Sequence, residues 1–293
     1  MIVAKRAVLL AALAGLVGAV GAAPQAVVEA VQAPAWVDRG EKRLPLTPGL
    51  ELTNRDRVVV GSGARAFLQL ADGSTVKLGE GSELSVNALG RRDSGVFTAA
   101  LDVAKGAFRL TTDALRKLQG ARAINVRIGT VTAGIRGTDI WGRADAERDF
   151  ICLLEGRITV THPQGEAAEL TEPNQYYGAD KGQPPGPVAS VDRVQVAKWS
   201  LETELADGVG TQQRGGRWGL SLGARASEGE ALDLFDRGRA AGYQFKIVPH
   251  RTSEGPYQYE LRLGQILTER EARLLADRLA RDLNVAVPTV LRR

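Results

Sequence analysis

The side chains that most often carry out chemistry are scarce in this chain of 293 residues, which has one cysteine, Cys152, and two histidines, His162 and His250. A single cysteine excludes an intramolecular disulfide and a cysteine-rich zinc module. Two histidines with different neighbours argue against a histidine-based metal site. Cys152 lies within the apolar run ICLLEG, which predicts a buried side chain that packs as a small hydrophobic residue.

Carboxylate pairs are the remaining candidates for catalysis. A glycosidase needs two carboxylates about 5–10 Å apart, one of them in a pocket. The closest sets in this sequence are Glu80 with Glu83, and Asp145 with Glu147 and Asp149. Both sets lie in polar, turn-like stretches, where carboxylates are usually solvated. We therefore expect a protein that is not an enzyme and that holds no metal and no cofactor.

The N-terminus indicates export from the cytoplasm. Lys5 and Arg6 precede an uncharged apolar run over 7–20, and small residues follow up to Ala22. This pattern is typical of a secretory signal peptide over 1–22. The apolar run is shorter than the roughly 20 residues that a membrane span needs. We expect a periplasmic protein, with an uncleaved inner-membrane anchor as the alternative.

The charge of the chain gives no reason to expect nucleic acid as a partner. The formal net charge is only +4, and a weak surplus of this size does not argue for nucleic acid. Stacking aromatic residues of the kind that bind RNA are not evident. Residues 217–293 hold 13 Lys and Arg against 10 Asp and Glu, so 13 − 10 gives this end a net charge of +3.

Short strands are expected over residues 44–177. Segments such as ARAFLQL alternate apolar and polar residues, and turn residues recur about every 8–12 residues, which favours a sandwich, roll or barrel of short strands. Asp72 and Gly73 favour a tight hairpin turn. One short helix is expected over 112–118. We predict an all-β domain over 38–180.

A change of composition over 181–217 predicts a linker rich in Pro and Gly. Within it, residues 191–205 have the spacing of a helix. The apolar side of this helix would carry Val194, Ala197, Trp199 and Leu201. The stretch that follows, ADGVGTQQRGG, is expected to be a flexible spacer.

An internal repeat predicts the second domain, over 218–293. Residues 220–243 align with 261–284 at an offset of 41, and nine of 24 positions are identical. Each half has the pattern of a strand, a Gly turn and a helix, with a second strand after it. Each predicted helix begins with a capping box, Ser227 with Glu230 and Thr268 with Glu271. We predict an α+β ferredoxin-like sandwich of order βαββαβ.

This repeat resembles the SPOR (sporulation-related repeat) domain in the segments GLSLG, AAGY, YELRLG and TEREA. Members of that family bind peptidoglycan glycan strands that lack stem peptides, using the sheet face that the helices leave open. Strand alternation turns four leucines toward the helices and polar residues toward the open face. The polar residues expected to bind glycan are Ser221, Gln244, Lys246, Glu260 and Arg262. The sequence departs from the family at Ser221, where Gln is common, and at Arg225, where Phe is common.

The β-rich region resembles the periplasmic FecR domain. The resemblance rests on LADGSTVKLGEGSEL (70–84), LDVAKGAFRL (101–110), VTAGIRGTDIWGR (131–143) and CLLEGRITV (152–160). The family includes regulators that sense a signal outside the inner membrane and control a sigma factor inside it. Only six residues precede the apolar run near the N-terminus. The resemblance therefore implies a sensing or interaction role rather than control of a sigma factor.

One motif within the FecR-like region contains an arginine between glycines: Gly134, Arg136, Gly137 and Asp139. Arg136 has two interpretations. It can bind a carboxylate or phosphate, or it can be structural, paired with Asp139 or a backbone carbonyl, as buried charges usually are. We favour the structural interpretation.

These features together predict an exported binding protein of the cell envelope. The SPOR-like domain would bind denuded peptidoglycan glycan strands, while the FecR-like domain senses or recruits a second partner, an envelope protein. One alternative is a membrane-anchored signalling regulator of the FecR type. Another, less favoured, is a cell-wall hydrolase.

Overall fold

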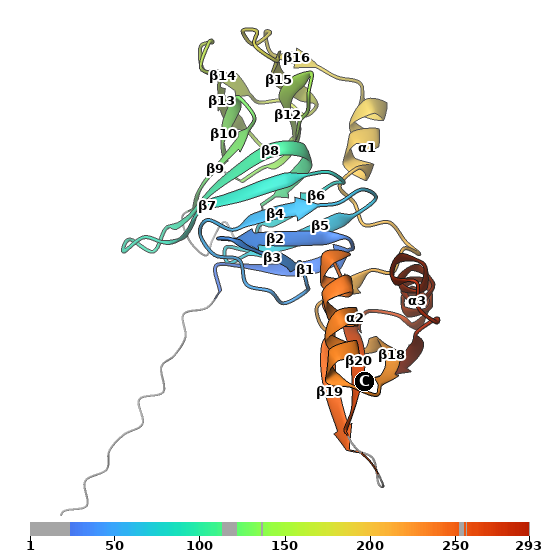
Figure 1. The fold of residues 1–293 in the computed structure, drawn as a ribbon. Coiled ribbons are helices and arrows are strands. Elements are labelled where there is room, and N and C mark those ends of the chain that lie inside the picture. The colour runs from blue at the N-terminus through green and yellow to red at the C-terminus, as the bar shows by residue number, and fades with distance from the viewer. Residues whose placement is uncertain (1–23, 113–121, 136, 252–254, 256, 293) are drawn as a thin grey trace, which may run out of the picture.

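The computed structural model of the protein describes residues 24–112, 122–135, 137–251, 255 and 257–292. The chain forms an elongated β domain followed by a smaller C-terminal domain with two helices (Figure 1). The predicted signal peptide over 1–22 lies outside the described residues, as does nearly all of the helix predicted over 112–118. Within the described residues, no helix is both long enough and apolar enough to cross a membrane.

The β domain contains only strands within the residues described, as predicted. Its strands are β1 (Ala26–Gln32), β2 (Ala35–Arg39), β3 (Lys42–Pro45), β4 (Arg57–Val60), β5 (Arg65–Leu70), β6 (Thr75–Leu78), β7 (Glu83–Arg91), β8 (Phe97–Thr111), β9 (Arg122–Ile128), β10 (Val131–Ile135), β11 (Asp139–Ala144), β12 (Arg148–Glu155), β13 (Ile158–Thr161), β14 (Ala168–Leu170), β15 (Gln175–Asp180) and β16 (Ala189–Ser190).

These strands form two layers. One layer has the order β16-β15-β12-β11-β8-β6-β5-β1, and every pairing in it is antiparallel. The other has the order β3-β2-β4-β7-β8-β9-β10-β13-β14, in which only the β8–β9 pair is parallel. Buried Val, Leu, Ile and Ala side chains fill the space between the layers, as expected for strands that bury one face each.

Strand β8 belongs to both layers. Residues 97–105 pair in the second layer and 106–111 in the first. The strand changes layer at Gly106, whose φ is +86°. A Cβ at this position would lie 2.4 Å from Cα of Ser82, so this crossing requires glycine.

The first strand of the domain was not expected. The sequence predicted that the β domain begins at residue 38, but β1 starts at Ala26 and pairs with the whole of β5. Five of its seven residues are apolar, and its burial pattern is almost continuous. Because both of its faces are covered, β1 lacks the alternation of apolar and polar residues that predicts a half-buried strand.

The C-terminal domain consists of β18 (Trp218–Arg225), α2 (Glu228–Ala240), β19 (Lys246–Arg251), β20 (Tyr257–Ile266), α3 (Glu269–Leu283) and β21 (Thr289–Arg292). Its strands lie in the order β21-β18-β20-β19, all antiparallel. Ser227 and Thr268 are the N-caps, and each hydroxyl accepts a hydrogen bond from the backbone three residues later. The leucines expected to face the helices lie in the buried cluster of this domain: Leu220, Leu222, Leu261 and Leu263.

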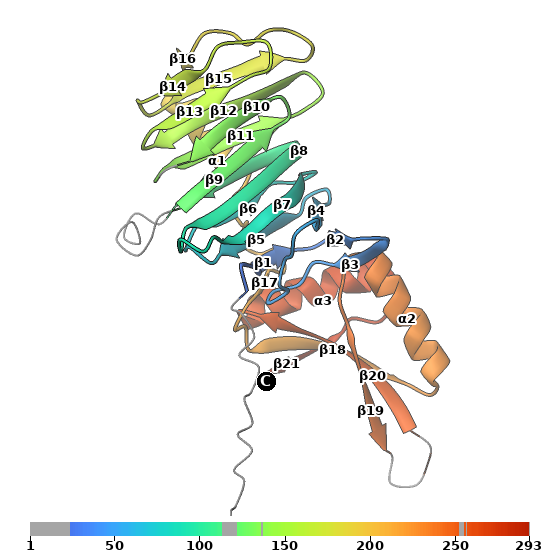
Figure 2. The same ribbon diagram turned by 90° about the vertical axis from the view of Figure 1, so that its left-hand side faces the viewer.

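The two domains are joined by a short strand, β17 (Gln212–Gln213), which pairs with β1 on one side and with Ile266 of β20 on the other. The first layer of the β domain therefore continues into the C-terminal sheet. Helices α2 and α3 lie between the β domain and that sheet (Figure 2). Ala33 of the β domain is part of the buried cluster of the C-terminal domain.

The spacer predicted to be flexible, residues 206–216, is fixed in place. The Glu271 carboxylate accepts hydrogen bonds from the backbone N–H groups of Gly208 (2.7 Å), Gly210 (2.6 Å) and Thr211 (2.8 Å). Gln32 of β1 also donates to Thr211 Oγ1, at 2.8 Å. Gly210 is needed for close approach to α3, since a Cβ at this position would lie 2.7 Å from Leu275.

Helix α1 (Arg193–Leu201) is shorter than predicted, and its Trp199 packs against an aromatic cluster of the β domain. Trp199 stacks on Trp141 of β11 with ring centroids 5.1 Å apart and an interplanar angle of 3°. Val194 and Leu201, which were expected on the packed side, are 64% and 69% exposed. The helix is therefore held on the β domain mainly by its aromatic residue.

Candidate functional site

Glu260 lies at the centre of a polar cluster on the open face of the C-terminal sheet. Its carboxylate accepts hydrogen bonds from the Ser221 hydroxyl and from Nη2 of Arg262, the latter at 2.6 Å. Ser221 contacts Oε1 of the carboxylate, while Nε2 of His250 lies 2.6 Å from Oε2, the oxygen that Arg262 also contacts. Three of the residues predicted to bind glycan, Ser221, Glu260 and Arg262, are therefore in direct contact. His250 was not among the predicted residues.

The strand register places the other predicted residues beside this cluster. Ser221 of β18 and Lys246 of β19 both lie directly opposite Arg262 of β20. Residues opposite one another in antiparallel strands share a face. Gln244 lies two residues before Lys246 and lines the same cleft as Arg262. All five predicted residues thus lie on one surface.

The cluster favours an ionised Glu260. The hydrogen bond from Arg262 lowers the pKa of this carboxyl most, burial opposes it, and the hydrogen bonds from Ser221 and His250 lower it further, to about 2. A carboxylate with so low a pKa is a poor proton acceptor. The arrangement therefore supplies a fixed array of charges and hydrogen-bonding groups rather than a general base.

Sequence reasoning overlooked one pattern here. Residues 219–223, GLSLG, have the G-x-S-x-G spacing of a serine hydrolase, and a histidine and a carboxylate lie nearby. In a catalytic triad the histidine lies between the serine and the acid. Here Glu260 lies between Ser221 and His250. Ser221 also lies within a strand, not at a sharp turn from a strand to a helix, so the motif has neither the order nor the context of a nucleophile.

A cleft of about 380 Å³ adjoins the cluster at the junction of the two domains. Its lining residues come from the open sheet, from β17 and from the loop at 47–50 of the β domain: Thr47, Pro48, Gly49, Leu50, Gln212, Gln244, Lys246, Arg262, Gly264 and Gln265. The lining contains two cations, three amides and no carboxylate. Such a lining suits a polar ligand with negative charge.

Within the arginine motif of the FecR-like region, Asp139 is held in place by hydrogen bonds from β8. The guanidinium of Arg109 donates to both of its carboxylate oxygens, at 3.0 Å and 2.6 Å, and Thr111 donates at 3.1 Å. Arg136 lies outside the described residues. Gly134 is within β10, and Gly137 has a φ of +74°. Asp139 therefore already has a bidentate partner, which sequence spacing could not reveal because Arg109 is 30 residues away.

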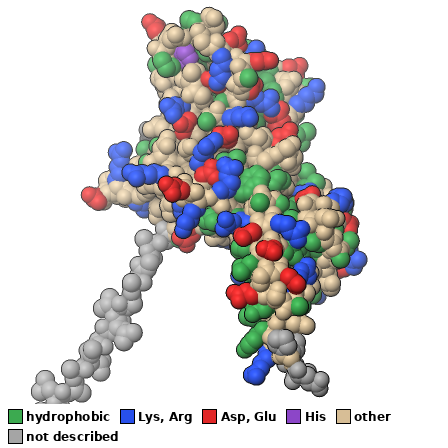
Figure 3. All heavy atoms as spheres, viewed as in Figure 1, with side chains coloured by type: hydrophobic (Ala, Val, Ile, Leu, Met, Phe, Trp, Pro, Cys, Tyr) green, Lys and Arg blue, Asp and Glu red, His purple; other side chains and the backbone are tan. Residues whose placement is uncertain are grey.

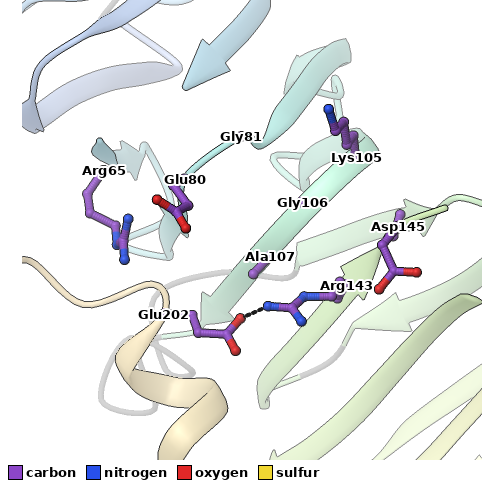
Figure 4. Close-up of a pocket in the computed structure, with 10 residues that line it drawn as sticks. Arg65, Glu80, Gly81, Lys105, Gly106, Ala107, Arg143, Asp145 and Glu202 are labelled. Atoms are coloured by element: carbon purple, nitrogen blue, oxygen red, sulfur yellow. Dashed lines mark hydrogen bonds and ion pairs between the residues drawn. The ribbon is translucent and has the colours of Figure 1, made fainter. Parts of the chain in front are cut away.

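A second cleft, of about 360 Å³, opens on the β domain and is lined by mixed charges (Figure 4). Glu202, just after α1, forms an ion pair with Arg143 of β11 across it. Burial raises the pKa of the Glu202 carboxyl, and Arg143 acts against this shift. The other charged lining residues are Arg65, Glu80, Lys105 and Asp145. Over the visible face of the β domain, acidic and basic side chains are likewise interspersed (Figure 3).

Features of a metal or redox centre are not found in the described part of the chain, which has no group of three or more His, Cys, Asp or Glu placed to hold a metal ion. Cys152 is fully buried in β12, and burial raises the pKa of its thiol to about 12. A buried thiol of this kind is inert.

Comparison with known families identifies the β domain. Residues 56–167 match the family model described as FecR protein. These residues form a FecR domain. The match covers β4–β13 and includes every residue that lines the mixed-charge cleft except Glu202. It does not extend to the C-terminal domain, whose relation to the SPOR family stays a prediction.

Two solved structures from Parabacteroides distasonis, each described as a "putative anti-sigma factor", are similar to the chain. The first has 18% identity and a TM-score of 0.40, and the match covers 51% of this chain and 65% of that one. The chain thus spans just under two thirds of that structure. The second has 14% identity and a TM-score of 0.39, with 78% of this chain and 92% of that one covered. No curated protein matches the chain.

Proposed function

We propose that this protein is a regulator of the FecR type in the cell envelope, in which the FecR domain binds a protein partner. The FecR domain at 56–167 is the observation that carries this proposal. The main interpretation from sequence alone, in which the protein binds the cell wall, has no support from the family match, which does not reach the C-terminal domain.

The junction between the domains supports a regulatory role. The C-terminal sheet is hydrogen-bonded to β1 through β17, and β1 is paired along its length with β5 of the FecR domain. A ligand or partner that binds one domain therefore contacts a sheet that continues into the other domain. Chains of packed side chains and hydrogen bonds of this kind can carry coupling between two sites.

The regulatory proposal can be tested by transcript analysis of cells with and without the gene. We expect a small, defined set of genes to change in expression, and we expect the wild-type chain to restore it. A chain with Arg143→Glu, which places two acids against each other in the mixed-charge cleft, should fold but restore the set incompletely. Unchanged transcription after deletion would contradict the proposal.

A second candidate function is binding of glycan strands by the C-terminal domain. The observation that favours it is the row of Ser221, Arg262 and Lys246 across three strands of an open sheet. Rigid sheets that present hydrogen-bonding side chains can position them on sugar hydroxyls. The test is co-sedimentation of the whole protein with amidase-treated sacculi. Arg262→Glu should release the protein into the supernatant, while Arg273→Glu, on the exposed side of α3, should not.

A further inference from the structure

We propose that the cleft between the 47–50 loop and the open C-terminal sheet binds a carboxylate-bearing saccharide that contacts both domains. This inference rests on the second candidate function, glycan binding by the C-terminal sheet. It adds that the β domain supplies one wall of the site and that the ligand requires a negative charge.

The charge of the cleft points to an anion. Lys246 and Arg262 lie directly opposite each other on adjacent strands, and like charges in this position are destabilising. Arg262 is paired with Glu260, which lies outside the cleft lining. Within the described part of the chain, no acidic group pairs with Lys246, and Nε of Arg262 is buried without a hydrogen-bond partner. A ligand carboxylate between the two side chains would pair with the Lys246 ammonium and offset its repulsion from the Arg262 guanidinium.

The remaining lining groups suit hydroxyls and amides of a sugar. Gln244 and Gln265 contribute side-chain amides, which can both donate and accept hydrogen bonds. Gln212 is held in place because its Nε2 donates to the carbonyl of Gly264, at 2.8 Å. The volume of about 380 Å³ is at the lower end of the range for small-molecule sites. It fits one or two sugar rings rather than a long strand enclosed on all sides.

The 47–50 loop forms the wall on the side of the β domain. Leu50 N–H donates to the carbonyl of Thr47 at 3.1 Å, which closes the turn, and Gly49 has a φ of +85°. A Cβ added at Gly49 would lie 3.7 Å from Nε2 of Gln265, so the turn lies close to the end of β20. Thr47 also lines the cleft and is half-buried. A ligand held by Lys246 and Arg262 thus meets residues of the β domain.

The experiment is calorimetric titration of the full-length protein with two probes. One is a tetrasaccharide of alternating N-acetylglucosamine and N-acetylmuramic acid without peptides, and the other is chitotetraose, which lacks the lactyl carboxylates. We expect the charged probe to bind about tenfold more tightly, the size of one favourable charge contact at partial exposure. Equal affinity for the two probes would overturn the proposed charge recognition.

The role of the loop is tested with Thr47→Glu, with Thr47→Gln as the neutral variant of matched length. The acid should weaken binding of the charged probe about tenfold and leave chitotetraose within twofold, which also shows that the variant is folded. Thr47→Gln should bind both probes like the wild type. Slower amide exchange over 47–50 in the wild type on binding the charged probe gives a second measure that needs no variant.

The results distinguish failure of the composite site from failure of glycan binding itself. If Lys246→Gln weakens binding but the two Thr47 variants bind alike and exchange over 47–50 is unchanged, the site belongs to the C-terminal domain alone. The composite site is then wrong and glycan binding stands. If neither probe binds, glycan binding is wrong, and the composite site falls with it.

Discussion

Arg278 of α3 donates a hydrogen bond to the carbonyl oxygen of Ala33, 2.9 Å away across the boundary between the two domains. The same guanidinium also donates to the carbonyl of Val209 in the connecting segment. Ala33 itself is 3% exposed and packs into the core of the C-terminal domain. The Arg278 side chain thus links α3, the β domain and the connecting segment. The junction between the domains is packed like the interior of a single domain.

Arg278→Ala should therefore destabilise the protein. Loss of partly buried hydrogen bonds from a charged donor is expected to lower the free energy of unfolding by about 1–3 kcal/mol. The matched control is Arg273→Ala on the same helix, which breaks only a surface pair with Glu269 and should cost less than about 0.5 kcal/mol. Urea denaturation measures both. Equal effects of the two variants would show that the Arg278 contact does not hold the junction.

Glu271→Gln should loosen the connecting segment. Burial alone would raise the pKa of this carboxyl, but the backbone N–H groups of Thr211, Gly208 and Gly210 outweigh it and keep the pKa below its usual value. An amide oxygen is a weaker acceptor for three N–H groups than a carboxylate is. Limited proteolysis should cut the variant faster over 206–211. Glu230→Gln, at the equivalent position of α2, should leave that rate unchanged.

Glu260 should make the stability of the protein depend on pH in acid. Its pKa is about 2 in the folded protein and 4.5 as the ordinary value, so the folded state favours the ionised form. The resulting stabilisation is complete above about pH 5 and is lost as the pH falls toward 2. The stability difference between wild type and Glu260→Gln should shrink over this interval in denaturation experiments. Ser221→Ala should shift the curve in the same direction, but less. A constant difference would contradict the proposed cluster.

Cys152 should report on global unfolding. Its side chain is fully buried and burial raises the pKa of its thiol to about 12, so almost no thiolate is present at pH 8. We expect no reaction with Ellman's reagent in the native protein and one equivalent after denaturation. Rapid reaction of the native protein would mean that β12 opens without global unfolding.

The sequence was sufficient where a local pattern determined the structure. The capping residues Ser227 and Thr268 begin their helices because the cap geometry needs only neighbours within one turn. Strand alternation likewise placed Ser221, Glu260 and Arg262 on one face of the sheet, because it depends only on neighbouring residues in each strand. The FecR resemblance likewise lay in short continuous segments of the chain, 70–84, 101–110, 131–143 and 152–160.

The sequence was insufficient where a residue has a distant partner. Glu271 has the sequence of a capping box, but its carboxylate accepts from a segment about 60 residues away. β1 was missed because its faces are both covered by elements later in the chain. The 47–50 loop lies close to Gln265, more than 200 residues later in the chain, where β17 joins the two sheets. The spacing of apolar and polar residues within one segment does not show which distant residues will contact it.

The FecR domain and the C-terminal domain form one structural unit through β1, β17 and β20. Differential scanning calorimetry of the full chain measures whether the two domains unfold together. We expect a single transition, with a van't Hoff enthalpy equal to the calorimetric one. Two separate transitions, with the C-terminal one unaffected by Arg278→Ala, would contradict it.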